Sequence, residues 1–235
     1  MKNKDGSLRF CIDYRRLNEV SHKDSYPLPR IYTCLDSMAG ARWFSIFDLR
    51  ADYHQVQIDP TSAEKTTFIT RDGTFKFEVM SFGLTGAPAT FRRLIDMVMS
   101  GLNLEICLVY LGDIIVFSAG VDEHLDRLRA ILERLRSARL KLKPSKCRLF
   151  QRSVSILGHI VSGVGMATDP WKIKSVAKWP VPACLKDLRS FVDLCGYDRR
   201  FVKGFAEIAA PLHKMTGKGV SYQITKLRFS ASSKH

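Results

Sequence analysis

The chain has 235 residues, of which 46% are hydrophobic and 26% are charged, which is enough to bury a core in one large domain or in two to three subdomains. Lys and Arg number 37 against 23 Asp and Glu, and the formal charge of +14 is typical of a globular protein that binds a polyanion, with nucleic acid as the first candidate. A membrane span is disfavoured because the longest apolar stretch, 106–120, is interrupted by Asp113, and a zinc site or disulfide scaffold is disfavoured because the six cysteines form no C-x-x-C pair.

The first fifty-eight residues predict an extended start followed by a helix and two strands. LRFCIDYRRLN (8–18) predicts a short strand, and the prolines of YPLP (26–29) hold the next segment extended, before a short helix that ends near Gly40. WFSIFD (43–48) is a compact apolar strand that ends on a carboxylate, Asp48. HQVQI (54–58) alternates polar with apolar residues, as a half-exposed strand does.

Two hairpins and two helices are predicted between residues 66 and 137. TTFITRDGTFKFEVM (66–80) carries Asp72-Gly73 between strand-like runs, and ICLVYLGDIIVF (106–117) carries Gly112-Asp113 in the same way. Residues 87–102 have helical spacing and a stop near Gly101. The following helix has Asp122 as a plausible cap and an apolar stripe of Leu125, Leu128, Ile131, Leu132 and Leu135.

The last third of the chain is basic and then helical. Residues 127–152 contain ten Lys or Arg and one acid, which favours a solvated face and phosphate contact about equally. SVSILGHIVS (153–162) predicts another hairpin, and Asp169 before Pro170 predicts a helix start. A further helix over 185–196 with Gly196 as its stop indicates a small helical subdomain, and the last twenty residues lose periodicity and are expected to fray.

Two aspartates stand out by their positions, Asp48 at the end of an apolar strand and Asp113 at a hairpin tip. If both lie at one sheet edge beside a basic surface, their oxygens suit Mg²⁺, which completes its coordination with water and substrate phosphates. The alternative for Asp113, half of a turn that carries a solvating charge, is favoured by the local pattern alone.

Nine sequence blocks decide between these alternatives. They are, in chain order, SLRFCIDYRRLN, YPLPRI, FDLRADYHQ, FGLTGAPATF, VYLGDIIVFS, HLDRLRAILERL, KPSKC, LGHIVS and LRSFVDLCGYDRRFVKGFAEIAAPL. With these blocks the chain resembles the reverse transcriptase of gypsy-type LTR retrotransposons over residues 2 to 215. The resemblance implies an α+β right-hand polymerase fold with fingers truncated at the N-terminus, a palm with an antiparallel sheet, and a helical thumb. The expected division is 1–165 for partial fingers and palm, 166–215 for thumb or connection, and 216–235 for a frayed tail.

The resemblance also implies the catalytic residues. In the family, three palm aspartates hold two Mg²⁺ (or Mn²⁺) ions, one in an F-D-L-R block and two in a Y-x-D-D hairpin. Asp48 matches the first and Asp113 the last, while Gly112 stands at the position of the remaining ligand. Glycine supplies neither charge nor side-chain oxygen to a divalent ion, so two ions are not expected to be held rigidly and activity is expected to fall by orders of magnitude.

Further positions carry over from the family with an alternative beside each. Tyr53 matches the aromatic gate under the incoming sugar, or is a half-buried tyrosine. Arg9 matches the fingers arginine at the incoming nucleotide, or is an edge charge. Phe82 and Gly83 match the loop that lines the nucleotide pocket, or form a turn before a helix. Five basic residues are expected to contact nucleic acid: Lys141, Lys143, Lys146, Arg199 and Arg200.

The expected function is RNA-directed DNA polymerase activity on an RNA or DNA template with primer, using deoxynucleoside triphosphates and Mg²⁺. No membrane partner is expected, a dimer with another polymerase subunit is left open, and the expected location is intracellular, in the cytoplasm, virus-like particles or the nucleus. One alternative is a catalytically inactive nucleic-acid-binding or structural remnant. Asp52, which stands where the family usually has glycine, also favours this alternative. Another is an unrelated basic α/β scaffold that associates with RNA.

Overall fold

The structure is a computed structural model that describes residues 10–27, 29–50, 52–110 and 112–217. The chain divides into two compact units. The first runs to Val154 and includes Ser162–Gly165, and the second consists of Ser155–Val161 and the described residues from Met166 onward. In the described ranges, no helix is long and apolar enough to cross a bilayer.

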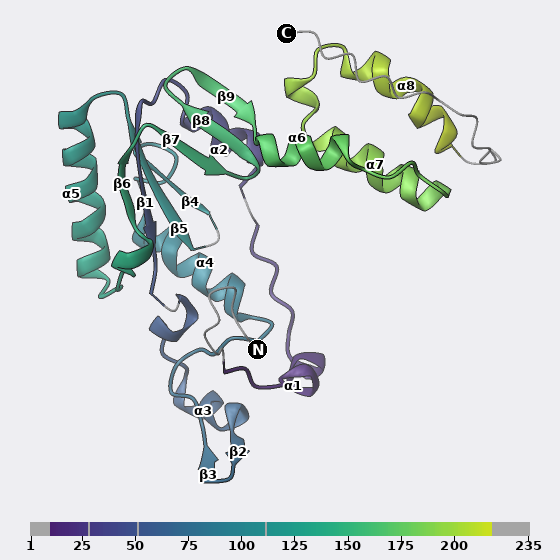
Figure 1. Cartoon of the computed structure of the whole chain (residues 1–235). Helices are drawn as coiled ribbons and strands as arrows, with labels where there is room; N and C mark the ends of the chain where they lie inside the picture. The colour runs from purple at the N-terminus through teal and green to yellow at the C-terminus, as the bar shows by residue number, and fades with distance from the viewer. Residues whose placement is uncertain (1–9, 28, 51, 111, 218–235) are drawn as a thin grey trace. The chain divides into compact units, whose positions relative to one another are not determined.

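A four-stranded antiparallel sheet is the centre of the first unit (Figure 1). Its strand order is β4-β5-β1-β6, from β4 (Cys107–Tyr110), β5 (Asp113–Ser118), β1 (Trp43–Asp48) and β6 (Arg148–Gln151). β1 therefore lies between β5 and β6, although β5 follows it by some seventy residues. The predicted strand over 43–48 is confirmed at both ends.

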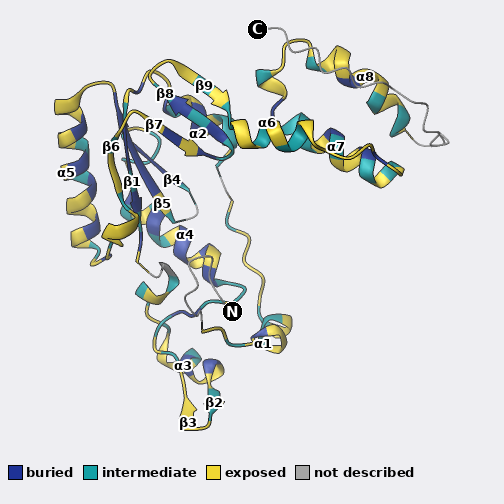
Figure 2. Ribbon diagram, in the orientation of Figure 1, coloured by how far each residue is buried: buried dark blue, intermediate teal, exposed yellow. Residues whose placement is uncertain are grey.

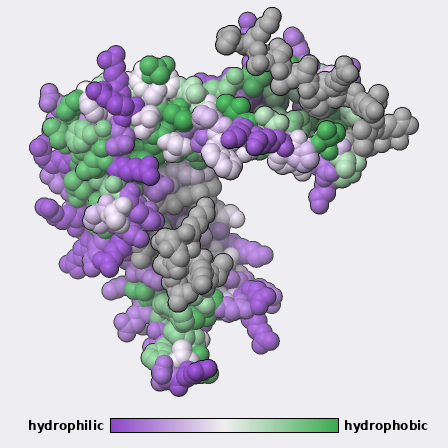
Figure 3. Space-filling model, viewed as in Figure 1, coloured by the Kyte–Doolittle hydropathy of each residue, from purple (hydrophilic) through white to green (hydrophobic). Residues whose placement is uncertain are grey.

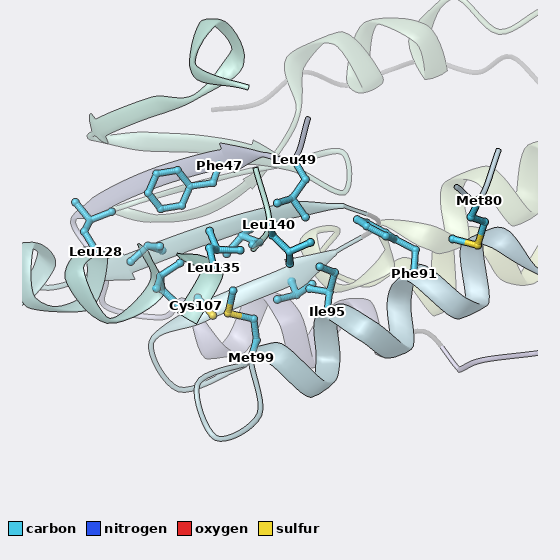
Figure 4. Packing of buried hydrophobic residues seen from close by; sticks show 14 of the residues in the cluster. Phe47, Leu49, Met80, Phe91, Ile95, Met99, Cys107, Leu128, Leu135 and Leu140 are labelled. Atoms are coloured by element: carbon cyan, nitrogen blue, oxygen red, sulfur yellow. The ribbon is translucent and has the colours of Figure 1, made fainter. Parts of the chain in front are cut away.

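Alternation along the strands gives this sheet two different faces. One face meets helices α4 (Ala87–Val98) and α5 (Val121–Ser137), and the buried β-strands and inner helix surfaces are the dark blue regions of Figure 2. Figure 4 shows the packing of this face, to which α4, α5 and the strands all contribute. Burial of each large apolar side chain contributes about 1.5–3 kcal/mol. The members of this hydrophobic core that Figure 4 labels are Phe47, Leu49, Met80, Phe91, Ile95, Met99, Cys107, Leu128, Leu135 and Leu140.

Smaller elements of the first unit precede and interrupt the sheet. They are α1 (Arg15–Val20), α2 (Ile31–Ser37), the 3-10 turns η1 (Asp52–Gln55), η2 (Glu64–Thr66) and η3 (Pro144–Lys146), helix α3 (Pro60–Ala63), and strands β2 (Phe68–Thr70) and β3 (Gly73–Phe75). The predicted 66–80 hairpin exists but is shorter. Figure 3 shows hydrophobic residues, in green, on this small β2–β3 hairpin, where Ile69 and Phe75 are exposed.

The C-terminal part contains one small sheet and three helices. β7 (Ser153–Ile156), β8 (His159–Ser162) and β9 (Gly165–Thr168) form a three-stranded sheet, and the helices are α6 (Pro170–Ala177), α7 (Leu185–Tyr197) and α8 (Phe205–Met215), with a 3-10 turn η4 (Arg199–Phe201). The predicted cap is confirmed, because the Asp169 carboxylate accepts from Trp171 N. The 153–162 hairpin and the 185–196 helix are also confirmed. Assignment of this part to a thumb or connection stays a prediction, and the expected frayed tail lies almost wholly outside the described residues.

Several local predictions are wrong. The segment 8–18 contains the start of helix α1 instead of a described strand, and 54–58 is a 3-10 turn followed by one bridge, Gln57 to Val79. Helix α5 begins after Gly120, with Asp122 in its first turn, and its buried stripe is His124, Leu128, Ile131 and Leu135. Gly196 lies inside α7 and does not end it. In each case tertiary packing outweighs a short local pattern.

A buried hydrogen-bond chain ties β1, β5, β6 and α5 together through His124. The imidazole Nδ1 lies 2.9 Å from Ser118 Oγ and Nε2 lies 2.7 Å from Ser45 Oγ. Because Ser118 Oγ donates to Gly120 O, it accepts from Nδ1–H. Ser45 Oγ accepts from Phe150 N, and its hydroxyl proton is available to donate to Nε2 of a neutral imidazole. These hydrogen bonds satisfy both ring nitrogens of a neutral imidazole.

The pKa of His124 is accordingly lowered, by burial first and by the nearby Arg127 second, against a smaller opposing effect of Glu123. A lowered native pKa contributes stability that is present above the unfolded value of about 6.5 and is lost as the pH falls. We expect the free energy of unfolding, measured with urea, to decrease from pH 7.5 to pH 5.5. In the His124→Gln variant this decrease should be much smaller. His54→Gln, at an exposed histidine, is the control; an equal decline in both variants would contradict the assignment.

Candidate functional site

Asp48 and Asp113 are directly opposite each other on neighbouring strands. The β1–β5 register pairs Asp48 with Asp113, and the β4–β5 register pairs Asp113 with Tyr110. Side chains of directly paired residues project from the same face, with Cβ atoms about 4.5–5.5 Å apart. By alternation this face is the one opposite α4 and α5. Both carboxylates therefore lie on one face at the same end of the sheet, which meets the condition for a shared metal ion.

Asp113 is part of a strand and is not half of the turn. β4 ends at Tyr110 and β5 begins at Asp113, so the two-residue connection consists of positions 111 and 112, one residue earlier than predicted. Gly112 has φ +103°, a backbone conformation that glycine adopts without the steric cost other residues meet. The chain thus has a residue without a side-chain oxygen beside Asp113, at the tip of the hairpin.

Basic residues surround the end of β1. Lys146 Nζ lies 3.0 Å from Asp48 Oδ2, with the Asp48 side chain 22% exposed and the Lys146 side chain 57% exposed. Lys143 N donates to Asp48 O, and Lys141 O accepts from Arg50 N. Three of the five predicted nucleic-acid residues therefore gather at the candidate site. The contact of Lys146 with Asp48 was missed because 98 residues separate the two, and no local pattern reports such a pair.

The two carboxylates offer the hard oxygen ligands that a divalent metal ion requires. Two carboxylates at one sheet edge, one of which already attracts an ammonium group, fit a single divalent cation. Within the described ranges, no cluster of three or more His, Cys, Asp or Glu side chains is arranged to hold a metal. The described residues therefore fit one Mg²⁺ and do not fit the pair of ions that the resemblance implies.

Lys146 and a divalent ion compete for Asp48 on electrostatic grounds. We expect Lys146→Gln to bind Mn²⁺ about two- to fivefold more tightly, the range expected for removing one exposed ion pair. Titration calorimetry measures this change. Lys186→Gln, at an exposed lysine of α7 in the second unit, is the control. An unchanged or weaker affinity in Lys146→Gln would show that the ammonium group does not compete at this site.

The predicted nucleotide-pocket residues form an aromatic group. Tyr53 and Phe82 have ring centroids 5.1 Å apart, and Tyr53 also lies 5.6 Å from Phe91 of α4. Gly83 has φ +98°, and a β-carbon there would lie 3.3 Å from Tyr14 Cδ2. The structure therefore brings Tyr53, Phe82 and Gly83 together.

Asn18 and Tyr14, which the sequence analysis did not identify, hold the loop around Phe82 and Gly83 in place. Asn18 of α1 donates to Gly83 O and accepts from Thr85 N, both at 2.8 Å, and Ser81 Oγ donates to Tyr14 OH. Nothing in their local spacing indicates these contacts, which join segments more than sixty residues apart.

Four positions named from the sequence are not placed beside Asp48 by the described residues. Arg9 lies outside the described residues, as does the side chain of Asp52. Arg199 and Arg200 are exposed in η4 of the second unit. Their grouping with the residues around Asp48 therefore stays a prediction.

Known proteins share this combination of sequence and fold. The family model for reverse transcriptase (RNA-dependent DNA polymerase) matches residues 1–161. The chain is 37% identical to the retrovirus-related Pol polyprotein from transposon 297 of Drosophila melanogaster over 221 residues, and 37% identical to that from transposon gypsy of the same organism over 218 residues. These alignments cover 94% and 93% of the chain but 21% of each relative, so the chain spans about a fifth of their length.

A solved structure supports the same fold. The foamy viral protease-reverse transcriptase in complex with ds DNA superimposes with a TM-score of 0.80 at 23% identity, over 96% of this chain and 40% of that one. The predicted right-hand polymerase architecture is thereby confirmed. Together with the family match and the paired aspartates, these similarities show that the chain belongs to the reverse transcriptase family, as the reverse transcriptase domain of a gypsy-type LTR retrotransposon Pol polyprotein.

Proposed function

We propose that this domain carries an RNA-directed DNA polymerase centre reduced to two metal-binding carboxylates. The single observation that supports it is the register of Asp48 with Asp113 at one sheet edge, beside a glycine. The substrates are a template with an annealed primer and deoxynucleoside triphosphates. The foamy viral relative in complex with ds DNA supports a duplex ligand.

The chain's own residues supply binding and orientation. Asp48 and Asp113 would hold a divalent cation, which in nucleotidyl transfer stabilises negative charge on the reacting phosphate oxygens. Tyr53 and Phe82 offer a rigid aromatic surface for the sugar and base of the nucleotide. Lys141 and Lys143 place positive charge near the end of β1, where backbone phosphates bind.

A second candidate function follows from Gly112. Preorganised charge stabilisation supplies much of the rate in phosphoryl transfer, and the lost ligand removes part of it. A domain that binds primer-template without extending it, alone or beside an active polymerase subunit, retains the basic surface and loses the chemistry. Its binding would weaken steeply as salt rises.

Primer extension on an RNA template distinguishes the two candidates. We expect the unmodified chain to add nucleotides slowly and Asp113→Asn or Asp48→Asn to abolish the addition, while the exposed Asp122→Asn of α5 leaves it unchanged. Binding of the same primer-template is measured in parallel by fluorescence anisotropy. Binding without extension by the unmodified chain would reject the enzyme in favour of the binding module, and extension that survives Asp113→Asn would reject the assigned centre.

A further inference from the structure

A basic pocket lies at the end of β1 remote from Asp48. Its volume is about 540 Å³, and its lining residues are Arg42, Arg152, Ser153, Ser162, Gly163 and Val164. Trp43, the first residue of β1, lies beside it, whereas Asp48 is the last residue of that strand. Five residues of extended strand separate them by about 17 Å. This pocket is therefore distinct from the candidate polymerase centre.

The Arg152 guanidinium group stacks on the Trp43 indole. The Arg152 guanidinium carbon lies 3.5 Å from the Trp43 ring centroid, and the Phe150 ring packs against the same indole in a T-shaped pair with centroids 6.0 Å apart. A guanidinium group stacked on an aromatic ring keeps its N–H donors in the plane of the group, free to meet an acceptor. The stacking thus prepares the group for a planar, bidentate ligand.

Arg42 is the second arginine that lines the pocket. Its N–H donates to Ser118 O at 2.8 Å, which fixes the start of the side chain. A β-carbon at position 163 would lie 3.1 Å from Arg42 Cγ, so glycine in the β8–β9 turn makes room for the Arg42 side chain. The turn and the arginine are therefore matched in shape.

The charge of this pocket is uncompensated within the described residues. Among the described residues, the arginines that form ion pairs are Arg15, Arg92, Arg93, Arg127 and Arg129. Neither Arg42 nor Arg152 is among them. Two guanidinium groups with nearby serine hydroxyls have the chemistry that binds a phosphate group, through bidentate charge-assisted hydrogen bonds. The pocket is open and much larger than one phosphate, which favours a phosphate within a longer molecule.

We propose that Arg42 and Arg152 bind a backbone phosphate of RNA at a second contact, separate from the polymerase centre. The proposal extends the function above, because template RNA outside the centre is the natural occupant of such a site on a domain of formal charge +14. Its ligand is recognised by charge and shape, without base-edge contacts.

Trp43 fluorescence tests the site independently of extension. In a chain with Trp171→Phe and Trp179→Phe, Trp43 is the remaining tryptophan, since the sequence has three. We expect its emission to change on titration with a 20-nucleotide single-stranded RNA, and the change to disappear in Arg152→Met, which retains an apolar stem over the indole. Arg136→Gln, an exposed arginine of α5, is the matched control and should leave the response intact.

Affinity and its salt dependence give the second readout. The double variant Arg42→Gln with Arg152→Met should bind RNA at least about tenfold more weakly at low salt. Its slope of log affinity against log salt should be smaller in magnitude by about 0.7, the value for one phosphate on a single strand. Gly163→Val should weaken binding in the same direction by displacing Arg42. Near-ultraviolet circular dichroism identifies misfolded variants. If the double variant is misfolded, the affinity and salt slope of the single variant Arg42→Gln provide the test.

The outcomes separate the possible ligands. An emission change with RNA but no primer extension would support this phosphate site and reject the polymerase function. An emission change with inorganic phosphate at low millimolar concentration but none with RNA would overturn the proposal in favour of a free-anion site. An unchanged salt slope in folded Arg42→Gln with Arg152→Met would also overturn it.

Discussion

Gly112→Asp is expected to raise the rate of RNA-templated primer extension by at least about 10²-fold over the unmodified chain. The substitution adds a carboxylate beside Asp113, and Asp113 is paired in register with Asp48, so three carboxylates then share one sheet edge. A gain of this size corresponds to the stabilisation lost when one preorganised group is removed from a site of this kind. Single-turnover kinetics with saturating primer-template measure the gain.

The same substitution should lower stability without Mg²⁺. Gly112 has φ +103°, where a residue with a β-carbon is strained, and the loss is expected to be about 1 kcal/mol or more. Mg²⁺ should then raise the melting temperature of Gly112→Asp more than that of the unmodified chain, because bound ligand stabilises the folded state. Gly101→Asp, at φ +77° in a loop after α4, controls for strain alone. Equal responses of both variants to Mg²⁺ would contradict a site at position 112.

Arg92→Ala is expected to reduce the free energy of unfolding of the first unit by about 3 kcal/mol, the usual cost of leaving one partner of a buried ion pair alone. The Arg92 side chain is 8% exposed, its Nε donates to Asp96 Oδ2 at 2.9 Å, and its Nη1 donates to Val109 O at 2.8 Å. A hydrogen bond to the same Asp96 raises the pKa of Tyr26. Arg92 thus joins α4 to β4, one strand of the hairpin that carries Gly112 and Asp113.

Urea unfolding followed by tryptophan fluorescence measures this loss. The adjacent Arg93 forms an ion pair with Asp24 at 2.7 Å, but both side chains are more than a third exposed. Arg93→Ala is therefore expected to change stability by less than about 1 kcal/mol. Arg92→Leu with Asp96→Leu should be less destabilised than Arg92→Ala, because no buried charge is left alone. Similar losses in Arg92→Ala and Arg93→Ala would show that Arg92 contributes no more than a surface pair.

Long periodic segments and strand patterns could be predicted from the sequence. Helices α4, α5 and α7 and strand β1 lie where their apolar spacing places them. Both hairpins with a Gly–Asp or Asp–Gly pair exist, yet each turn begins one residue earlier than the pair suggests. β2 and β3 pair Thr70 with Gly73, and β5 starts at Asp113. Pairing of β5 with β1 as well as β4 determines where it starts, and a local motif does not report that third strand.

The candidate site was predicted in part for a similar reason. Asp48, Asp113 and the glycine between Leu111 and Asp113 were identified by their motifs, and the sheet register brings the two aspartates together. The contacts of Lys146 with Asp48 and of Asn18 with Gly83 join distant segments, so no periodicity indicates them. His124 left a usable signal, because it continues the apolar stripe of Leu128 and Ile131 one turn earlier. A polar residue on a buried stripe indicates a hydrogen-bond network that stabilises the core.

The number of divalent ions bound tests most directly whether two carboxylates remain from a three-carboxylate centre. Electron paramagnetic resonance of bound Mn²⁺ counts the ions in the unmodified chain, in Asp113→Asn and in Gly112→Asp. The prediction is one ion per unmodified chain, none in Asp113→Asn, and two in Gly112→Asp in the presence of primer-template and nucleotide. Two ions in the unmodified chain under the same conditions would contradict it, because the described residues around Asp48 and Asp113 would then hold a complete centre without a third aspartate.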